Sequence, residues 1–298
     1  MQVGVGLPTT IPATRGDTVI EWARRADSGP FSSVAVLDRL VYDSYDPLLA
    51  LAAAAGVTRH VRLATLVVVG PLRNAALLAK SAASLDALSG GRFTLGLAVG
   101  ARHEDYVAAG VDYRARGRRL AEQLAGFRDA WEDERAGPAA VRPGGPALLV
   151  GGLSDEAFAR VARYADGYVH GGGPPRAFAR AADKARAAWL HAGRPGAPRL
   201  WGQGYFALGR ETAEPGAAYL RDYYAFTGHF AEKVAEGLLT TPQAIAQFIR
   251  GYADAGCDEL VLFPTVSDPA ELDRLGDVLA SLNATIEQPV RAGNEELR

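Results

Sequence analysis

Short runs of Val, Leu, Phe and Tyr alternate along the chain with longer stretches in which apolar residues recur every three or four positions. The short runs are typical of buried β-strands, and the longer stretches are typical of helices that pack by one face. Eight strands are predicted, at Val3–Leu7, Ser33–Leu37, Val61–Val69, Phe93–Val99, Ala147–Val150, Gly167–His170, Leu200–Leu208 and Glu259–Phe263. Helices are predicted between most of them, at Asp17–Ser28, Pro47–Ala55, Asn74–Ser89, Tyr113–Asp133, Ser154–Ala165, Pro175–Ala192 and Pro242–Ala255.

The order strand, helix, strand, helix predicts parallel strands joined by right-handed crossovers. Eight such units favour a closed (β/α)₈ barrel, a TIM barrel of the α/β class, formed as one domain by residues 1–298. The first half has no Gly-x-Gly-x-x-Gly fingerprint at the start of a helix, which argues against an open dinucleotide-binding sheet. The Gly/Pro-rich segment Arg135–Pro146 predicts a long exposed loop before the fifth strand.

Composition narrows the possible partners. With 298 residues and a formal net charge of −2, the chain has no global attraction to nucleic acid or to an anionic membrane, and we expect neither as a partner. Cys257 is the only cysteine, which excludes an internal disulfide and a cysteine-based metal site. The sequence shows no signal peptide and no apolar run long enough to span a membrane, so we expect a cytoplasmic location.

Candidate chemistry follows the predicted strands, because barrel enzymes draw their functional groups from the carboxyl ends of strands. The second strand is followed by Asp38 and Arg39, with Tyr42 close behind, and the fourth strand is followed by His103 and Glu104. For any one of these residues, a solvated loop that caps the next helix is the more ordinary interpretation. As a group, they make the loop after the fourth strand the richest candidate for catalysis.

Two glycine-rich turns follow the fifth and sixth predicted strands. Gly151 and Gly152 precede Ser154, which can cap a helix or offer its hydroxyl beside free helix N–H groups. Gly171 and Gly172 follow the next strand, and two adjacent turns of this kind suit a phosphate. The alternative is a plain helix cap, since acidic residues directly after Ser154 are typical of an ordinary helix start.

Other catalytic templates fit poorly. The chain has no Gly-x-Ser-x-Gly elbow, no His-Glu-x-x-His pair and no P-loop. Its five histidines lack ligand spacing, so we expect no metal. Asp38 and Glu104 could form a glycosidase pair, but two carboxylates chosen from 34 acidic residues are poor evidence for one.

Several segments together resemble the bacterial-luciferase-like flavin oxidoreductase family. The most specific is the turn Leu88-Ser89-Gly90-Gly91-Arg92 before the fourth strand. The resemblance spans nearly the whole chain in order, through Asp38–Leu40, Leu63–Lys80, Leu85–Leu97, Leu149–Ser154, Ala165–Tyr168 and Ala255–Leu262.

The resemblance implies a barrel that binds FMN, reduced FMN or the deazaflavin coenzyme F420 at its carboxyl end. The ring system would lie beside Val68, Val69 and Gly70, with Gly100 and Ala101 near its pyrimidine edge. The Gly151, Gly152 and Ser154 turn would take the phosphate together with Gly171 and Gly172. The family also implies a non-proline cis peptide bond, here expected around Val68 to Gly70.

One residue departs from the family pattern. Many relatives carry His after the acidic residue that follows the second strand, whereas this chain has Arg39. Arginine cannot take up a proton near neutral pH, although it can stabilise an anionic flavin or substrate. Proton transfer, if the reaction needs it, would then fall to His103, Glu104 or Tyr42.

Three functions are open at this point. The leading hypothesis is a monooxygenase that uses reduced FMN and O₂ to oxidise a small organic substrate, with a flavin reductase and a second copy of the chain as candidate partners. The second is an F420-dependent hydride transferase, supported by Arg176 and Arg180 near the second glycine turn. The third is a non-catalytic flavin-binding barrel, favoured by the missing histidine.

Substrate identity depends on three predicted loops, Leu40–Asp46, His103–Val111 and Tyr219–Leu239. The last is rich in aromatic residues and either lines a pocket or packs in the core. Core packing is the more common fate of such residues, and we favour it.

Overall fold

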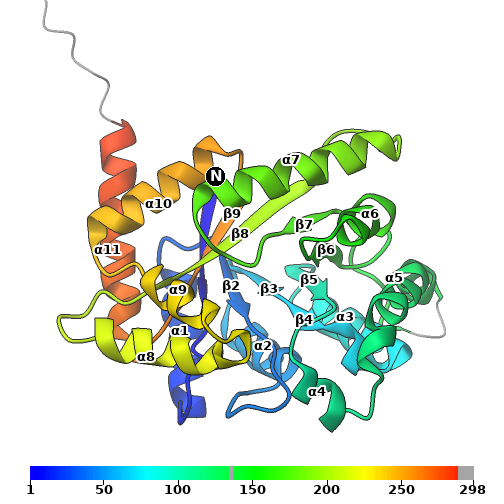
Figure 1. Ribbon diagram of the computed structural model, residues 1–298, viewed down its shortest axis with the longest axis horizontal. Helices are drawn as coiled ribbons and strands as arrows, with labels where there is room; N and C mark the ends of the chain where they lie inside the picture. Colours follow the sequence, from blue (N-terminus) through cyan, green and yellow to red (C-terminus); the bar gives the residue numbers. More distant parts are fainter. Residues whose placement is uncertain (134–136, 288–298) are drawn as a thin grey trace, which may run out of the picture.

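The computed structural model describes residues 1–133 and 137–287, and its centre is a closed parallel barrel (Figure 1). The strands run around the barrel in the order β3-β2-β1-β9-β8-β7-β6-β5-β4, and a pairing between β3 and β5 closes it. They are β1 (Gln2–Gly6), β2 (Ser33–Val36), β3 (Arg62–Thr65), β4 (Val68–Val69), β5 (Phe93–Ala98), β6 (Ala147–Gly151), β7 (Gly167–Val169), β8 (Arg199–Phe206) and β9 (Glu259–Pro264). Because β3 and β4 share one position, the barrel has eight positions, which confirms the predicted (β/α)₈ fold.

Helices connect successive strands and surround the barrel (Figure 1). They are α1 (Gly16–Ser28), α2 (Pro47–Val57), α3 (Ala75–Leu88), α4 (His103–Ala108), α5 (Arg116–Glu132), α6 (Asp155–Tyr164), α7 (Pro175–His191), α8 (Ala213–Tyr223), α9 (Phe230–Glu236), α10 (Pro242–Asp254) and α11 (Ala270–Glu287). Within the described residues, no helix is long and apolar enough to cross a membrane.

The third predicted strand is divided in two. The single run expected at Val61–Val69 forms β3 and β4, and the non-proline cis peptide bond lies between Leu66 and Val67 rather than around Val68 to Gly70. At this break the Thr65 hydroxyl accepts from the Gly96 N–H at 2.9 Å and donates to the Gly96 carbonyl at 2.8 Å. The Thr65 side chain thereby provides hydrogen-bond partners for the backbone of Gly96 in β5, where the regular hydrogen bonds between strands are interrupted.

The core has two layers, because successive strand residues point to opposite faces of the sheet. Leu37, Leu66, Trp201, Tyr205 and Phe263 belong to one cluster inside the barrel, whereas the alternating strand residues pack outward against the helices. The inner cluster also contains Tyr219, Leu220 and Tyr223 of α8 and Ala235 of α9. The barrel interior is therefore closed at one end by aromatic side chains of the connection between β8 and α10.

Local sequence failed to predict four helices. α4 replaces part of the expected loop His103–Val111, α8 and α9 occupy much of Tyr219–Leu239, and α11 follows the last strand. The first two of these regions lie at the rim of the barrel, where packing against strand ends stabilises short helices that have little periodicity of their own. Of the Gly/Pro-rich loop, residues 137–146 are irregular as expected, while Arg135 and Ala136 lie outside the described residues.

Candidate functional site

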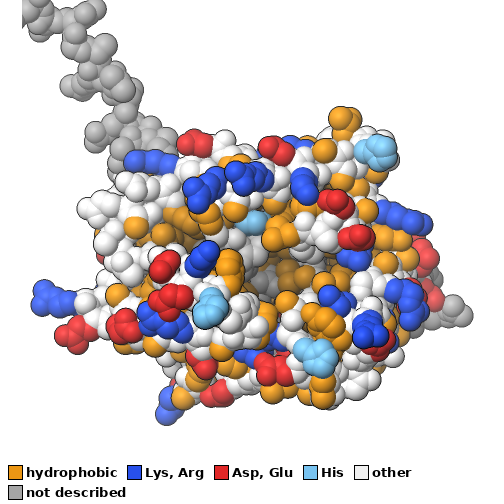
Figure 2. Space-filling view, viewed as in Figure 1, with side chains coloured by type: hydrophobic (Ala, Val, Ile, Leu, Met, Phe, Trp, Pro, Cys, Tyr) orange, Lys and Arg blue, Asp and Glu red, His pale blue; other side chains and the backbone are white. Residues whose placement is uncertain are grey.

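A hollow marks the face of the molecule shown in Figure 2, between α9, α7 and α4 of Figure 1. Each of these helices begins in a connection that follows the carboxyl end of a strand. Hydrophobic side chains line much of the rim, and Lys and Arg side chains gather on the side toward α4 and α5. The hollow therefore lies where barrel enzymes carry their sites.

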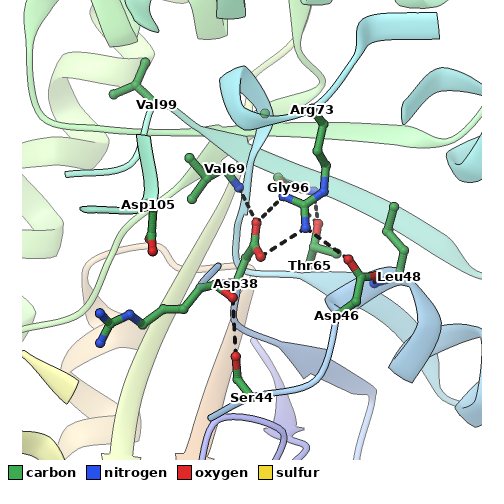
Figure 3. Close-up of polar contacts among 12 residues, drawn as sticks. Asp38, Ser44, Asp46, Leu48, Thr65, Val69, Arg73, Gly96, Val99 and Asp105 are labelled. Atoms are coloured by element: carbon green, nitrogen blue, oxygen red, sulfur yellow. Dashed lines mark hydrogen bonds and ion pairs between the residues drawn. The ribbon is translucent and has the colours of Figure 1, made fainter. Parts of the chain in front are cut away.

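Asp38 connects two neighbouring strand ends (Figure 3). Its buried carboxylate accepts from the Val69 N–H at 2.8 Å and from both terminal nitrogens of Arg73, at 2.6 and 3.1 Å. Arg73 is held on its other side by Asp46, at 3.2 Å. The Asp38 carboxylate is thus fully engaged, and its visible role is to fix the end of β4 and the segment that follows it.

Arg39 is brought together with Glu104 and Tyr42, as the sequence predicted for a shared site. Its guanidinium is buried, forms an ion pair with the half-exposed Glu104 carboxylate and lies 4.4 Å from the centre of the Tyr42 ring. It also donates to the carbonyl of Tyr223, at 3.3 Å, a residue that sequence analysis assigned to core packing. Tyr223 is both buried in the inner core and part of the rim.

His103 lies apart from this group. It is the exposed first residue of α4, and its ring centre lies 5.3 Å from that of Tyr113. The Tyr42 hydroxyl donates to the carboxylate of Asp222, and burial raises the pKa of Tyr42 above its ordinary value. Tyr42 therefore keeps its proton at neutral pH and can act as a donor but not as a base.

The ends of β4 and β5 meet at the residues predicted to contact a flavin ring. Gly100 has a φ of 68°, and a Cβ added there would lie 2.7 Å from a methyl group of Val69. The Gly70 carbonyl is held by the Gln123 side-chain amide at 2.9 Å, and Ala101 is exposed beside Gly100. Glycine is needed at position 100 because a side chain would displace Val69.

The first glycine turn leads into α6 as predicted. The Ser154 hydroxyl caps the helix by accepting from the Ala157 N–H at 3.3 Å. Gly151 ends β6, and Gly152 has a φ of 132°, which favours glycine. The helix cap and an anion site are compatible, because one cap satisfies one of several free N–H groups.

Two arginines lie close to the start of α5. Arg160 of α6 lies within 2.9 Å of a Cβ placed at Gly117, near the start of α5. Arg116, in the first turn of α5, stacks 3.8 Å from the centre of the Tyr113 ring, and the Tyr113 hydroxyl donates to the Ala101 carbonyl. Among the described residues, no carboxylate lies within ion-pair distance of Arg116 or Arg160.

The second glycine turn neighbours the first, since β6 and β7 pair directly. Gly171 faces open space, Gly172 has a φ of 100°, and the Gln203 amide donates to the Gly171 carbonyl at 3.1 Å. Arg176 and Arg180 follow on α7 and are exposed.

Sequence reasoning missed several of these residues. Arg73, Arg116, Arg160 and Tyr223 lie on helices or beyond strand ends, so no spacing linked them to the glycine turns. One usable signal existed for Arg116. A cation in the first turn of a helix opposes the helix dipole and is uncommon without an anionic partner.

These features fit a planar cofactor that carries a phosphate. Gly100 keeps the surface beside Val69 clear of a side chain, and Arg116, Arg160 and the α6 N-terminus supply positive charge. A cluster of His, Cys, Asp or Glu suited to a metal ion is absent from the described part of the chain. A parallel barrel with open strand ends of this kind is an architecture that many enzymes share.

Comparison with known proteins gives the family. The model of the luciferase-like monooxygenase family matches residues 1–260, and the chain belongs to that family. It is 33% identical over 192 residues to an uncharacterized protein of Mycobacterium tuberculosis, a match that covers 52% of this chain and 66% of that protein. It is 32% identical over 123 residues to the oxygenase component of a flavin-dependent trigonelline monooxygenase of Acinetobacter baylyi, covering 40% of this chain and 34% of that protein. The chain thus matches less than two thirds of the length of these relatives.

Solved structures share the fold. Monooxygenase RslO1 from Streptomyces bottropensis superimposes with a TM-score of 0.77 at 20% identity, over 97% of this chain and 100% of that one. An F420-dependent secondary alcohol dehydrogenase superimposes with a TM-score of 0.78 at 17% identity, over 94% of this chain and 98% of that one. A monooxygenase and an F420-dependent dehydrogenase therefore share this architecture.

Proposed function

We propose that the protein is a monooxygenase that uses reduced FMN and O₂ to oxidise a small organic substrate. The observations that carry the proposal are the junction of β4 and β5, where Gly100 leaves the surface beside Val69 clear of a side chain, and the glycine turn that leads into α6. Val68, Val69 and Gly70 would contact one side of the ring system, with Gly100 and Ala101 at its edge. When bound, reduced flavin supplies the electrons and the reaction with O₂.

The phosphate would be held by the first glycine turn. Gly151, Gly152 and Ser154 provide close backbone approach and a helix N-terminus, and Arg116 and Arg160 provide charge. Gly171 and Gly172 of the neighbouring turn would complete the pocket. Arg–phosphate contacts are charge-assisted and set the register of the whole cofactor.

The chain would contribute orientation, solvent exclusion and proton donation. Asp38 fixes Val69, and the tyrosines of α8 keep water from the barrel interior. Arg39 cannot exchange a proton, so it would stabilise negative charge. Tyr42, Glu104 and His103 remain the candidate proton donors; Glu104 and Tyr42 lie against Arg39, whereas His103 would act from the α4 side.

An F420-dependent hydride transferase is the second candidate, and one observation favours it. Arg176, Arg180 and Arg250 are exposed, and none forms an ion pair within the described residues. α10 packs on the start of α7, where a Cβ at Gly251 would lie 2.7 Å from Pro175. These cations would suit the acidic units of the deazaflavin tail.

Anaerobic titration of the purified protein with reduced FMN and reduced F420 tests the assignment. Tighter binding of FMN, followed by faster O₂ consumption when substrate is added, is the expected outcome. Tighter binding of F420 would reassign the protein to hydride transfer. Flavin binding with no turnover across substrates would favour the non-catalytic barrel.

The phosphate contacts are tested in the same titration. Arg116→Gln should weaken FMN binding at least tenfold and leave riboflavin, which lacks the phosphate, nearly unaffected. Arg118→Gln is the matched control, because Arg118 is exposed and pairs with Glu122 on the same helix. Equal effects of the two substitutions on FMN binding would place the phosphate elsewhere.

A flavin reductase as the source of reduced FMN, and a homodimer as the assembly, also belong to the proposal. Leu49 of α2 and Leu77 of α3 are 73% and 69% exposed, and α2 carries no charged residue. An apolar surface of this kind suits a second copy of the chain. Light scattering after size exclusion should give twice the chain mass, and Leu49→Asp with Leu77→Asp should halve it.

A further inference from the structure

Arg102 sits between two aromatic rings at the rim of the hollow. Its guanidinium carbon lies 4.5 Å from the centre of the Tyr223 ring and 4.4 Å from that of Phe226. One terminal nitrogen donates to the Tyr223 carbonyl at 3.2 Å, the same carbonyl that Arg39 contacts at 3.3 Å. Two arginines from different strand ends therefore meet at the end of α8.

The positive charge of Arg102 has no acidic counterpart in the described residues. The neighbouring carboxylates are engaged elsewhere: Glu104 pairs with Arg39, Asp105 accepts from the Val41 N–H at 2.8 Å, and Asp222 accepts from Tyr42. Arginine keeps its charge at all accessible pH values, so Arg102 cannot remove its unpaired charge by losing a proton.

The two arginines also have hydrogen-bond donors that are not used. The Nε atoms of Arg39 and Arg102 are buried and have no hydrogen-bond partner. Arg39 as a whole is 8% exposed, so its free donor is not satisfied by bulk water. Buried donors without acceptors are costly, and two of them at one rim indicate that an acceptor is still to be supplied.

We propose that Arg102 and Arg39 form the subsite for the anionic end of the substrate, and that the substrate is an aromatic carboxylic acid. The carboxylate would approach Arg102 at the rim, and its ring would pack against Phe226, which is 41% exposed. This inference rests on the proposed function, because it names the substrate class of that same site. Arg116 and Arg160 stay with the cofactor phosphate, so the two anions use separate arginines.

Matched acid and amide pairs test the proposal by isothermal titration calorimetry. The probes are benzoate with benzamide and 2-naphthoate with 2-naphthamide, each titrated into the protein with and without bound FMN. At least one acid should bind tenfold or more tightly than its amide, because only the acid provides a charged acceptor.

Variants identify the residue responsible. Arg102→Gln should remove the preference for the acid while leaving amide binding within about twofold, and Arg102→Lys should retain part of the preference. Arg118→Gln is the control and should behave as the unaltered protein. Circular dichroism and FMN affinity of each variant report whether it is folded.

The arginine side-chain ¹⁵N–¹H spectrum gives a second readout. The Nε–H signal of Arg102 is identified by its absence from the spectrum of the Arg102→Lys variant. Binding of the acid should shift this signal, and binding of the amide should not. Equal affinity for acid and amide in both pairs, or an acid preference that survives Arg102→Gln, would overturn the proposal. Selective acid binding by protein that does not bind FMN would support this subsite while rejecting the proposed function.

Discussion

The carboxylate of Asp38 connects the end of the second strand to the end of β4 through Val69 and to the segment after β4 through Arg73. The side chain is 2% exposed, and that of Arg73 is 22% exposed. Removing one member of such a pair leaves the other as an uncompensated charge in a poorly solvated position. At this position a carboxylate is needed to fix the surface on which the cofactor would lie.

Asp38→Asn should therefore lower the free energy of unfolding by about 3 kcal/mol and weaken FMN binding, because Arg73 loses its charge partner and one of the two acceptor oxygens becomes an NH₂ donor. Urea unfolding and flavin titration measure the two effects. Asp17→Asn is the control, since Asp17 and Arg15 form an exposed pair, and exposed ion pairs contribute little to stability. A loss of unfolding free energy no larger than that of the control would show that Asp38 does not hold Val69 and Arg73 in place.

His170, at the end of β7, gives a pH-dependent prediction. It is 4% exposed, and burial lowers its pKa below the ordinary value of 6.5. The unfolded chain therefore takes up this proton more readily than the folded protein, and the stability present above pH 6.5 is lost as the pH falls below it.

His170→Gln should flatten this loss, because the variant has no imidazole to protonate. The measurement is the change in free energy of unfolding between about pH 7.5 and about pH 5.5, where the variant should lose less than the unaltered protein. The exposed His229, replaced by Gln, should leave the pH dependence as it is. If both variants lose stability in parallel with the unaltered protein, protonation of His170 is not coupled to unfolding.

At the scale of elements, α8 is attached to the barrel by tyrosine hydroxyls. The Tyr219 hydroxyl lies 2.8 Å from the hydroxyl of Thr10, which follows β1. The Tyr224 hydroxyl, just after α8, lies 2.6 Å from the Tyr205 hydroxyl on β8. Arg39 and Arg102 add contacts at the carboxyl-terminal end of the helix, where cations interact favourably with its dipole. These contacts explain how a short helix in a long connection stays closed over the barrel interior.

Tyr219→Phe should cost about 1 kcal/mol, because it removes one buried hydrogen bond and leaves the ring in place. Hydrogen exchange should become faster across α8 and change little in α6. Tyr164→Phe on α6 is the matched control, since that hydroxyl has no hydrogen bond within residues 1–133 and 137–287. Uniform acceleration throughout the molecule would instead indicate a global loss of stability.

At the scale of the whole molecule, large side chains of one strand fill the barrel interior beside glycines of the next strand. A Cβ placed at Gly6 of β1 would lie 2.1 Å from the Phe263 ring of β9. Glycine at this position therefore makes room for a large ring from the neighbouring strand. The packing couples the first strand of the chain to the last.

Gly6→Ala should destabilise the protein by about 1–3 kcal/mol, because the ring cannot move without displacing the packed interior. Adding Phe263→Leu should recover part of the loss, which a double-mutant cycle in urea would detect. Gly56→Ala, in α2 with open space around its Cβ, should instead stabilise by about 0.5–1 kcal/mol. Independent effects at positions 6 and 263 would contradict the proposed contact.

The sequence determined the order of strands and helices, because alternating apolar runs and helical periodicity are local properties of the chain. It also placed the two glycine turns and Glu104 directly after strand ends, where the structure has them, although Glu104 lies in α4 and not in a loop. The break at Leu66–Val67 and the helices α4, α8 and α9 were not predictable, since they depend on contacts with distant strands.

Tertiary structure alone decided which candidates act together. Asp38 is adjacent to Arg39 in sequence, yet their side chains join different networks, one with Arg73 and one with Glu104. Tyr223 and Arg102 are 121 positions apart and meet only because the connection after β8 folds back over the barrel. Such pairings depend on three-dimensional closure of the barrel, which brings strand ends together regardless of their separation along the chain.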